Sequence, residues 1–154
     1  MKTRILGALV GFALCCAAPV LAQEASSELK IFKADDLVWQ DLKIFKNAKI
    51  VYLLGGPDNS TSNVFRVKYP AHYKSPAFSV SQSQFVTVIS GIYHTDLSNG
   101  IELKPGDSYL VPAAQAHHLW TGDEETVLQI SRFGGPQKVT FVDPKDDPRN
   151  QADK

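Results

Sequence analysis

The residues of this chain best suited to chemistry are its four histidines, which are His72, His94, His117 and His118. An imidazole exchanges a proton near neutral pH and is also a common metal ligand, so each histidine is a candidate for acid–base catalysis or metal binding. No other catalytic pattern competes with them. The sequence has no Ser-His-Asp order, no P-loop and no dinucleotide-binding glycine pattern, and it has no CxxC pair after residue 22. The function therefore depends on which histidines the fold brings together.

The segment between residues 72 and 121 has a regular spacing of turn residues and candidate site residues. The spaced positions of its two halves are His72, Phe78, Val80, Gln84 and Gly91, and then Gly106, Pro112, Ala114, His117 and Thr121. Fourteen residues separate Gly91 from Gly106, which suits a compact connection between strands. This spacing resembles the two motifs of the cupin superfamily. The resemblance extends from Trp39 to Arg149, where the chain is similar to small exported single-domain cupins.

The resemblance implies an all-β fold, the cupin-type double-stranded β-helix or jelly-roll barrel. In cupins that bind a metal, two histidines and a glutamate of the first motif and a histidine of the second surround the ion. Here the corresponding residues are Phe78, Val80, Gln84 and His117. Two of them are hydrocarbon and a third offers only a neutral amide oxygen, so they cannot supply the three or four ligands that a transition metal needs. We therefore predict a degenerate motif with no metal ligands and no cofactor.

The same residues predict a pocket inside the barrel. Because alternate residues of a strand point the same way, Phe78 and Val80 should face the lumen together with Gln84 and His117. We add His94 to this pocket, although the glycine turn before it leaves its direction open. An apolar floor with a few polar groups is typical of a site for a small organic molecule.

Two other interpretations of His117 stay open. It can be a hydrogen-bonded core residue in a barrel whose interior has filled in. It is also the candidate catalytic residue, either as a general acid or base or in a metal site rebuilt with His94.

Short apolar segments recur along the chain, each bounded by Gly, Pro, Asn, Asp or Ser. They predict strands at residues 49–54, 64–69, 84–89, 92–95, 101–103, 108–111, 117–120, 126–130 and 139–142. The pentapeptide LKIFK occurs at 29–33 and again at 42–46, and we interpret both copies as amphipathic β segments. No helical pattern of ten residues is present after residue 22, which favours a β-sandwich or β-barrel.

The first 22 residues have the features of a cleaved signal peptide. Lys2 and Arg4 precede an apolar run, and Val20-Leu21-Ala22 forms a cleavage pattern before Gln23. We predict a disordered lead-in at 23–28, the barrel domain at 29–142 and a polar tail at 143–154, of which only the first few residues should be anchored. The location that follows is the periplasm or the exterior of the cell.

Removing this signal changes the composition. Both cysteines, Cys15 and Cys16, lie within it, so the remaining chain contains no thiol and must be stabilised by its core. Without Lys2 and Arg4, 14 basic residues remain against 16 acidic ones, a net charge of −2. The sequence therefore lacks the basic surface of a nucleic-acid-binding protein, and no membrane segment is expected after cleavage.

These observations lead to one expected function and one alternative. We expect a non-enzymatic, metal-free cupin that binds a small organic molecule or acts structurally, with a pocket lined by Phe78, Val80, Gln84, His117 and His94. The alternative is a cupin enzyme that uses a rebuilt metal site or His117 as acid or base. A homodimer is a further possibility, because many cupins pair through their outer strands.

Overall fold

The computed structural model describes residues 29–57 and 62–151. The chain divides into two compact units, Met1–Ile31 and Phe32–Lys154, and all ten strands of the described residues lie in the second unit. The described part of the chain contains no α-helix, which confirms the all-β prediction. None of its helical segments has the length and apolar character that a bilayer-spanning helix requires. The predicted signal peptide and the lead-in to residue 28 lie outside the described residues.

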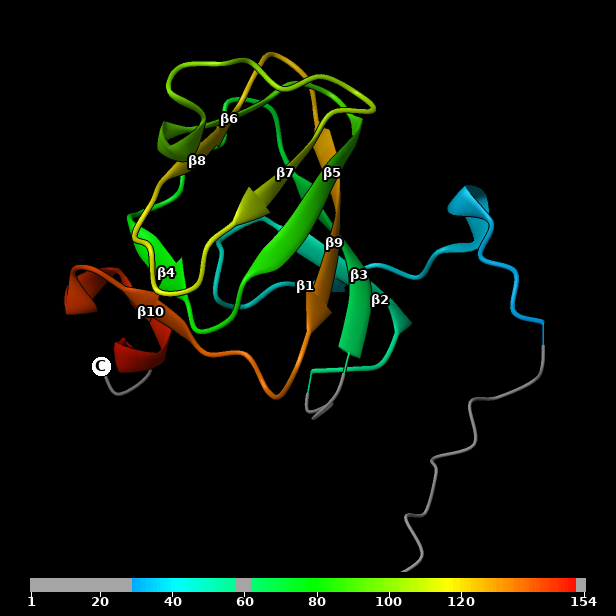
Figure 1. Ribbon diagram of the computed structural model, residues 1–154, viewed down its shortest axis with the longest axis horizontal. Coiled ribbons are helices and arrows are strands. Elements are labelled where there is room, and N and C mark those ends of the chain that lie inside the picture. The colour runs from blue at the N-terminus through cyan, green and yellow to red at the C-terminus, as the bar shows by residue number, and fades with distance from the viewer. Residues whose placement is uncertain (1–28, 58–61, 152–154) are drawn as a thin grey trace, which may run out of the picture. The chain divides into compact units, whose positions relative to one another are not determined.

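Six of the strands form one antiparallel sheet in the order β1-β2-β3-β9-β5-β7. These strands are β1 (Gln40–Asp41), β2 (Lys49–Leu54), β3 (Ser62–Tyr69), β5 (Gln84–Ser90), β7 (Ser108–Val111) and β9 (Thr126–Phe133). The other four form two antiparallel pairs, β4 (Phe78–Val80) with β10 (Val139–Phe141), and β6 (Tyr93–Thr95) with β8 (Leu119–Thr121). Figure 1 shows both pairs on one side of the unit and β3, β5 and β9 on the other.

The two strand pairs are joined through the backbone into a second layer. Phe78 and His117 form an antiparallel bridge with hydrogen bonds of 3.0 and 2.9 Å in the two directions. Further along, the Ser75 amide donates to the Leu119 carbonyl at 2.9 Å. Apolar residues of both layers form one core, among them Val67, Val86, Leu128, Phe78, Leu119 and Phe141. The fold is therefore two β layers closed around a common interior.

Strict alternation decides which side chains enter this interior. Every second residue of β3 and β9 is buried, as a period of two requires. On β4, Phe78 and Val80 are buried and Ser79 is less so. β9 continues three residues beyond the predicted strand at 126–130, which places Arg132 on the buried side with Ile130.

Turns with left-handed backbone connect the strands at the motif positions. Gly91 has a φ of 75° and Gly106 a φ of 94°. A Cβ atom on Gly91 would lie 2.5 Å from the carbonyl oxygen of Glu125, whereas one on Gly106 would meet nothing within 4 Å. His72 and Ala114 occupy the two motif positions where glycine is missing, and they keep φ values of 56° and 61°. All four motif positions therefore have a left-handed backbone, with or without glycine.

The prediction of two β segments at the LKIFK repeats is wrong. Residues 29–33 form no strand and lead into the short 3-10 turn η1 (Ala34–Asp36). Residues 42–46 belong to the connection between β1 and β2, where the Leu42 amide donates to the Ala48 carbonyl at 2.9 Å. Asn47, with a φ of 63°, reverses the chain there, and Phe45 still reaches the core. The apolar side chains of 42–46 therefore pack inward from a turn, whereas Leu29 and Ile31 of the first copy are exposed.

Two other predicted strands differ from the structure. Residues 101–103 make only a single bridge, Tyr93 to Leu103, because they follow the 3-10 turn η2 (Asp96–Ser98) and a left-handed residue, Asn99. The strand predicted at 117–120 is displaced, since β8 begins at Leu119 and His117 contributes only its bridge to Phe78.

More of the C-terminal tail is held than expected. It forms two 3-10 turns, η3 (Pro144–Asp146) and η4 (Pro148–Asn150), whose first amides are capped by Asp143 and Asp147. Arg149 Nη2 donates to the Val139 carbonyl at 2.9 Å, which ties the tail to β10.

Candidate ligand-binding site

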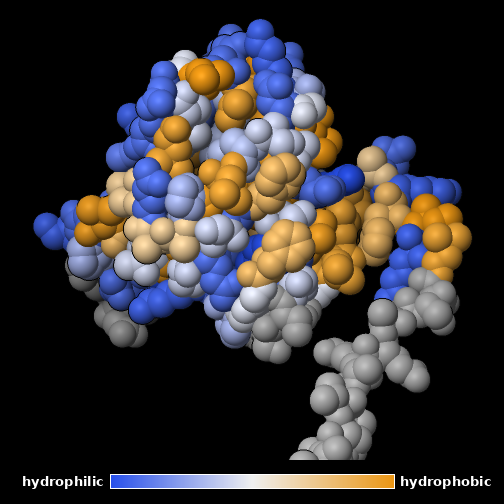
Figure 2. All heavy atoms as spheres, viewed as in Figure 1, coloured by the Kyte–Doolittle hydropathy of each residue, from blue (hydrophilic) through white to orange (hydrophobic). Residues whose placement is uncertain are grey.

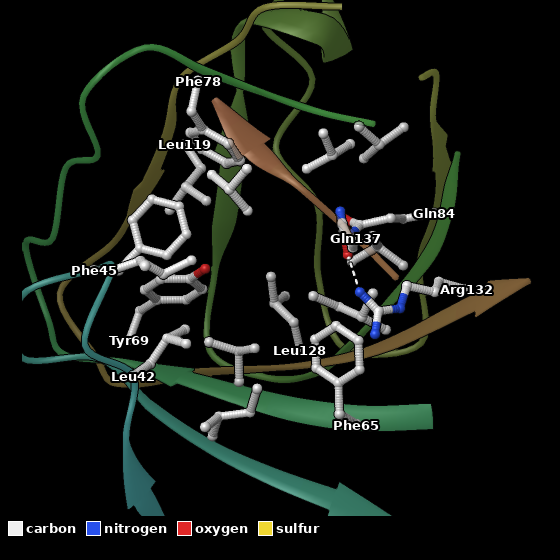
Figure 3. Close-up of a pocket in the computed structure, with 18 of the residues that line it drawn as sticks. Leu42, Phe45, Phe65, Tyr69, Phe78, Gln84, Leu119, Leu128, Arg132 and Gln137 are labelled. Atoms are coloured by element: carbon white, nitrogen blue, oxygen red, sulfur yellow. Dashed lines mark hydrogen bonds between the residues drawn. The ribbon is translucent and has the colours of Figure 1, made fainter. Parts of the chain in front are cut away.

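A cavity of about 200 Å³ lies in the interior and is lined by residues of both layers. We call it the central cavity; Figure 3 shows many of its lining side chains. Aromatic rings form much of its apolar wall, and those of Phe45 and Phe78 meet edge to face with their centroids 4.8 Å apart. Apart from tyrosines, its described polar lining consists of Gln84, His117, Arg132 and Gln137. The cavity is mainly hydrophobic, with a small number of hydrogen-bonding groups.

The outer surface differs from this interior. Across the face seen in Figure 2, apolar residues are interspersed with hydrophilic ones. Phe85 and Leu110, which are register partners on β5 and β7, are both exposed. The central cavity, by contrast, is lined mainly by apolar residues.

Four of the five residues expected to line a pocket lie around the central cavity. Phe78, Val80, Gln84 and His117 all contribute to its wall. The Phe78 and His117 rings have centroids 4.4 Å apart, because their backbones form a bridge. These four residues therefore lie together at the central cavity, as the strand alternation and the turn spacing of the sequence predict.

His94 does not line the central cavity, so its inclusion among the pocket residues is corrected. On β6 the side chains of Tyr93 and Thr95 are buried, and alternation directs His94 to the opposite side. Its ring stacks on Trp120, with a centroid distance of 5.5 Å and an interplanar angle of 5°. It is therefore in no position to join His117 in a rebuilt metal site.

His117 is only 4% exposed and has one well-defined polar contact. Its Nδ1 lies 3.1 Å from the carbonyl oxygen of Gln115. A carbonyl can only accept, so in the neutral ring Nδ1 carries the proton and Nε2 is the accepting nitrogen. Burial lowers the pKa of His117, although the bond to Gln115 and the charge of Asp96 act in the opposite direction. The neutral imidazole is the favoured form at neutral pH.

The donor atoms present do not fit the metal that cupin motifs usually hold. Phe78 and Val80 have no lone pairs, which leaves the amide of Gln84 and the imidazole of His117 at those positions. Across residues 29–57 and 62–151, no group of three or more His, Cys, Asp or Glu side chains is placed to hold a metal ion. We derive no chemistry through a metal at this site.

Two polar, non-aromatic residues of the central cavity were missed from the sequence, Arg132 and Gln137. Arg132 Nη1 and Gln84 Nε2 both donate to Oε1 of Gln137, each at 2.8 Å, and the bond from Arg132 is drawn in Figure 3. Alternation beyond Ile130 would have predicted that Arg132 faces inward. Gln137 follows a Gly-Gly-Pro turn and carries no pattern that distinguishes it from a surface loop residue.

The charge of Arg132 is not neutralised by any described residue. The ion pairs of the described part of the chain all involve other side chains. Its Nε atom is buried without a hydrogen-bond partner, as is Nε2 of Gln137. Burial lowers the pKa of Arg132, with the Tyr52 hydroxyl acting in the opposite direction, but a guanidinium stays protonated in proteins.

Buried tyrosines add neutral hydroxyl groups to the wall. Tyr93 and Tyr109 stack with their ring centroids 5.5 Å apart, and Tyr69 lines the same cavity. Burial raises the pKa of all three phenols, so they carry no charge at physiological pH. Arg132 is consequently the charged group of the described cavity lining.

Comparison with known proteins adds information on the fold. No protein-family description matches the sequence, and no curated protein matches it. Among solved structures, the polyketide cyclase RemF from Streptomyces resistomycificus superposes with a TM-score of 0.65 at 16% identity, covering 82% of this chain and 94% of RemF.

Two further structures carry explicit fold descriptions. An RmlC-like cupin from Ralstonia eutropha JMP134 has a TM-score of 0.62 at 14% identity, covering 78% of this chain and 76% of that one. An uncharacterised protein with a double-stranded β-helix domain from Klebsiella pneumoniae has a TM-score of 0.57 at 23% identity, covering 76% of this chain and 94% of that one. The two-layered barrel around the central cavity therefore has the cupin fold, the double-stranded β-helix of the RmlC-like proteins.

Proposed function

We propose that this protein is an exported cupin that binds a small organic molecule in the central cavity. The observation that carries the proposal is the composition of the cavity wall, an apolar and aromatic lining into which Gln84, His117 and Arg132 project. Ligand sites are typically concave, largely apolar and equipped with a few convergent polar groups. Binding without a metal is favoured because two of the usual ligand positions are Phe78 and Val80.

The size of the cavity limits the ligand. Its volume of about 200 Å³ lies below the ~300–1,000 Å³ of sites for drug-sized molecules. A water molecule in the liquid occupies ~30 Å³, so the space corresponds to several waters. We expect a ligand with one ring or a short chain.

A pair of substitutions on β4 tests this site. Val80→Phe adds bulk at an inward position and should abolish the binding of small aromatic probes. Ser79→Phe adds the same ring at the neighbouring, less buried position and should preserve it. Thermal shift is a suitable measurement, because a ligand that binds only the folded state raises the melting temperature. Equal binding by both variants would contradict the proposed location.

The absence of a metal requirement is tested separately. Elemental analysis of the purified, dialysed protein should give no stoichiometric Fe, Mn, Ni or Zn. One equivalent of any of them would overturn the metal-free part of the proposal.

A second candidate function is catalysis by His117. The observation that favours it is a neutral imidazole at the cavity wall, oriented by the Gln115 carbonyl so that Nε2 is free to accept a proton. The fold similarity to a polyketide cyclase is compatible with this alternative. His117→Ala should then abolish turnover and leave the melting temperature nearly unchanged. A large loss of stability without any change in turnover would instead identify His117 as a core residue.

Export is the remaining part of the proposal. It is supported by the charged, apolar and small-residue pattern of residues 1–22. Mass spectrometry of the protein from the periplasm or medium should show a chain beginning at Gln23. A cytoplasmic protein that retains residues 1–22 would contradict it.

A further inference from the structure

The charge in the central cavity points to a chemical class of ligand. We propose that Arg132 binds the carboxylate of a small monoanionic acid, whose apolar body occupies the aromatic part of the cavity. This inference rests on the small-molecule site proposed above and adds the identity of the group that Arg132 recognises.

Arg132 is placed inside the barrel by the register of an interior strand. On β9 it lies opposite Asn63 of β3 on one side and Gln84 of β5 on the other. The residue is only 5% exposed, and its guanidinium carbon lies 5.8 Å from the centre of the Phe65 ring. Arginine is seldom buried to this degree without an anionic partner, because removing its charge from water costs several kcal/mol.

The protein satisfies this guanidinium incompletely. Nη1 donates to Oε1 of Gln137, a neutral oxygen that also accepts from Gln84, while Nε has no partner. Among residues 29–57 and 62–151, no carboxylate lies within ion-pairing distance of Arg132. A buried charge whose described partners are neutral is the arrangement expected of an anion site before its ligand binds.

The surroundings of Arg132 select among anions. A planar carboxylate matches the fork of the guanidinium, and the unpartnered Nε2 of Gln137 adds an amide donor nearby. The rings of Phe45 and Phe78 line much of the remainder of the cavity and offer no hydrogen bond to a hydrophilic anion, while Tyr69 adds a neutral hydroxyl to an otherwise apolar ring. Inorganic phosphate would use the charge and leave this wall uncovered. An acid with one aromatic ring or a short aliphatic chain pairs with the guanidinium and also packs against the apolar wall.

Isothermal titration with three probes tests the inference, using the processed chain at pH 7. Benzoate supplies a carboxylate and a ring, benzamide supplies the ring with a neutral head group, and inorganic phosphate supplies only the charge. Because hydrogen bonds to charged groups are worth roughly ten- to hundredfold in affinity, benzoate should bind at least about tenfold more tightly than benzamide. Phosphate should bind more weakly than benzoate and should not displace it at equal concentration.

Two arginine variants locate the charge that is recognised. Arg132→Met should weaken benzoate binding by roughly ten- to hundredfold and leave benzamide binding unchanged. Arg66→Met is the matched control, because Arg66 also donates to a glutamine, Gln129, at 3.2 Å, but from the other face of the same sheet. It should bind all three probes like the unmodified protein. Because Arg132 is in no ion pair of the described residues, Arg132→Met leaves no other buried charge without its partner and is expected to fold. Arg132→Lys retains the charge as a second check.

The outcomes separate this inference from the proposed function. If benzoate and benzamide bind equally, or if Arg132→Met behaves like Arg66→Met, the carboxylate assignment is overturned and the apolar binding site stands. If phosphate binds as tightly as benzoate, the site recognises an anion alone and the apolar-acid class is wrong. If neither benzoate nor benzamide binds, the small-molecule function itself fails.

Discussion

Gln84 and Arg132 lie opposite each other on β5 and β9, and their side chains donate to the same oxygen atom, Oε1 of Gln137. Two strands of the large sheet are thereby connected to the loop that precedes β10. Gln137 is the single acceptor of both bonds, so the order of the polar part of the cavity depends on a residue outside any strand.

This dependence predicts the effect of Gln137→Leu. The substitution leaves two buried donors without their acceptor, and each unsatisfied group costs about 1–3 kcal/mol. We expect the free energy of unfolding, measured by urea denaturation, to fall by at least about 2 kcal/mol. Gln129→Leu removes the corresponding acceptor of Arg66 on the less buried face of the sheet and should cost less than about 1 kcal/mol. Similar losses in both variants would contradict the structural role of Gln137.

The two motif glycines should differ in their tolerance of a side chain. Alanine at either Gly91 or Gly106 places a Cβ on a left-handed backbone, at a cost of about 1–2 kcal/mol. At Gly91 the added atom also collides with the Glu125 carbonyl at 2.5 Å, whereas at Gly106 it enters open space. We expect Gly91→Ala to lower the free energy of unfolding by more than about 3 kcal/mol and Gly106→Ala by about 1 kcal/mol. Equal effects would show that the collision at Gly91 is relieved elsewhere.

The lowered pKa of His117 predicts a pH dependence of stability. Burial favours the neutral ring in the folded state, while an unfolded histidine has a pKa near ~6.5. As the pH falls below ~6.5 the unfolded chain binds more protons than the folded one, so stability decreases until the folded pKa is passed. His117→Phe should remove this loss between about pH 7 and pH 5.5.

His94→Phe serves as the control for this pH dependence. Its ring lies against Trp120, outside the central cavity, so the variant leaves the surroundings of His117 unchanged and should keep the loss of stability that His117 causes. Chemical denaturation at a series of pH values measures both. A slope that persists in His117→Phe would mean that another group is responsible.

The cavity should accept a metal once its donors are restored. Phe78→His, Val80→His and Gln84→Glu together place two imidazoles and a carboxylate beside His117, whose ring centroid is already 4.4 Å from that of Phe78. Zinc is bound by such donors at ~2.0–2.2 Å, so we expect one equivalent of Zn²⁺ to bind in a calorimetric titration. Ser79→His, on the alternate side of β4, should bind none, and the same is expected of the unmodified chain.

The sequence predicted the parts of the fold that depend on period and turn chemistry. β2 and β7 have the predicted bounds. β2 is an apolar run closed by a turn, and β7 is a short segment with turn residues on both sides. Phe78 and Val80 face inward, as the period of two predicts. The strand prediction at 42–46 is wrong because an apolar pentapeptide fits a strand and an inward-packed turn equally well, and only tertiary contacts distinguish the two. At 29–33 the same letters lie exposed outside any strand.

The candidate site was predicted only in part. The strand predicted at 126–130 stops short of Arg132, whose charge interrupts the apolar alternation, although β9 continues to Phe133 and buries this residue. The direction of His94 depends on the backbone at Gly91, which the sequence leaves undetermined. Gln137 enters the site through a loop, where no periodicity exists to predict which way a side chain points.

Ala114 is a position at which a substitution should raise the stability of the barrel. Its amide donates to the Val80 carbonyl at 2.7 Å, a bond that glycine would keep, while its φ of 61° is one that glycine adopts without strain. Glycine at this position removes a left-handed strain of ~1–2 kcal/mol from the folded state. It also makes the unfolded chain more flexible, which lowers the free energy of unfolding by only ~0.5–1 kcal/mol. Ala114→Gly is thus a small thermostabilising change that adds no atom to the cavity, which makes it a convenient background in which weakened binding variants can be screened without unfolding.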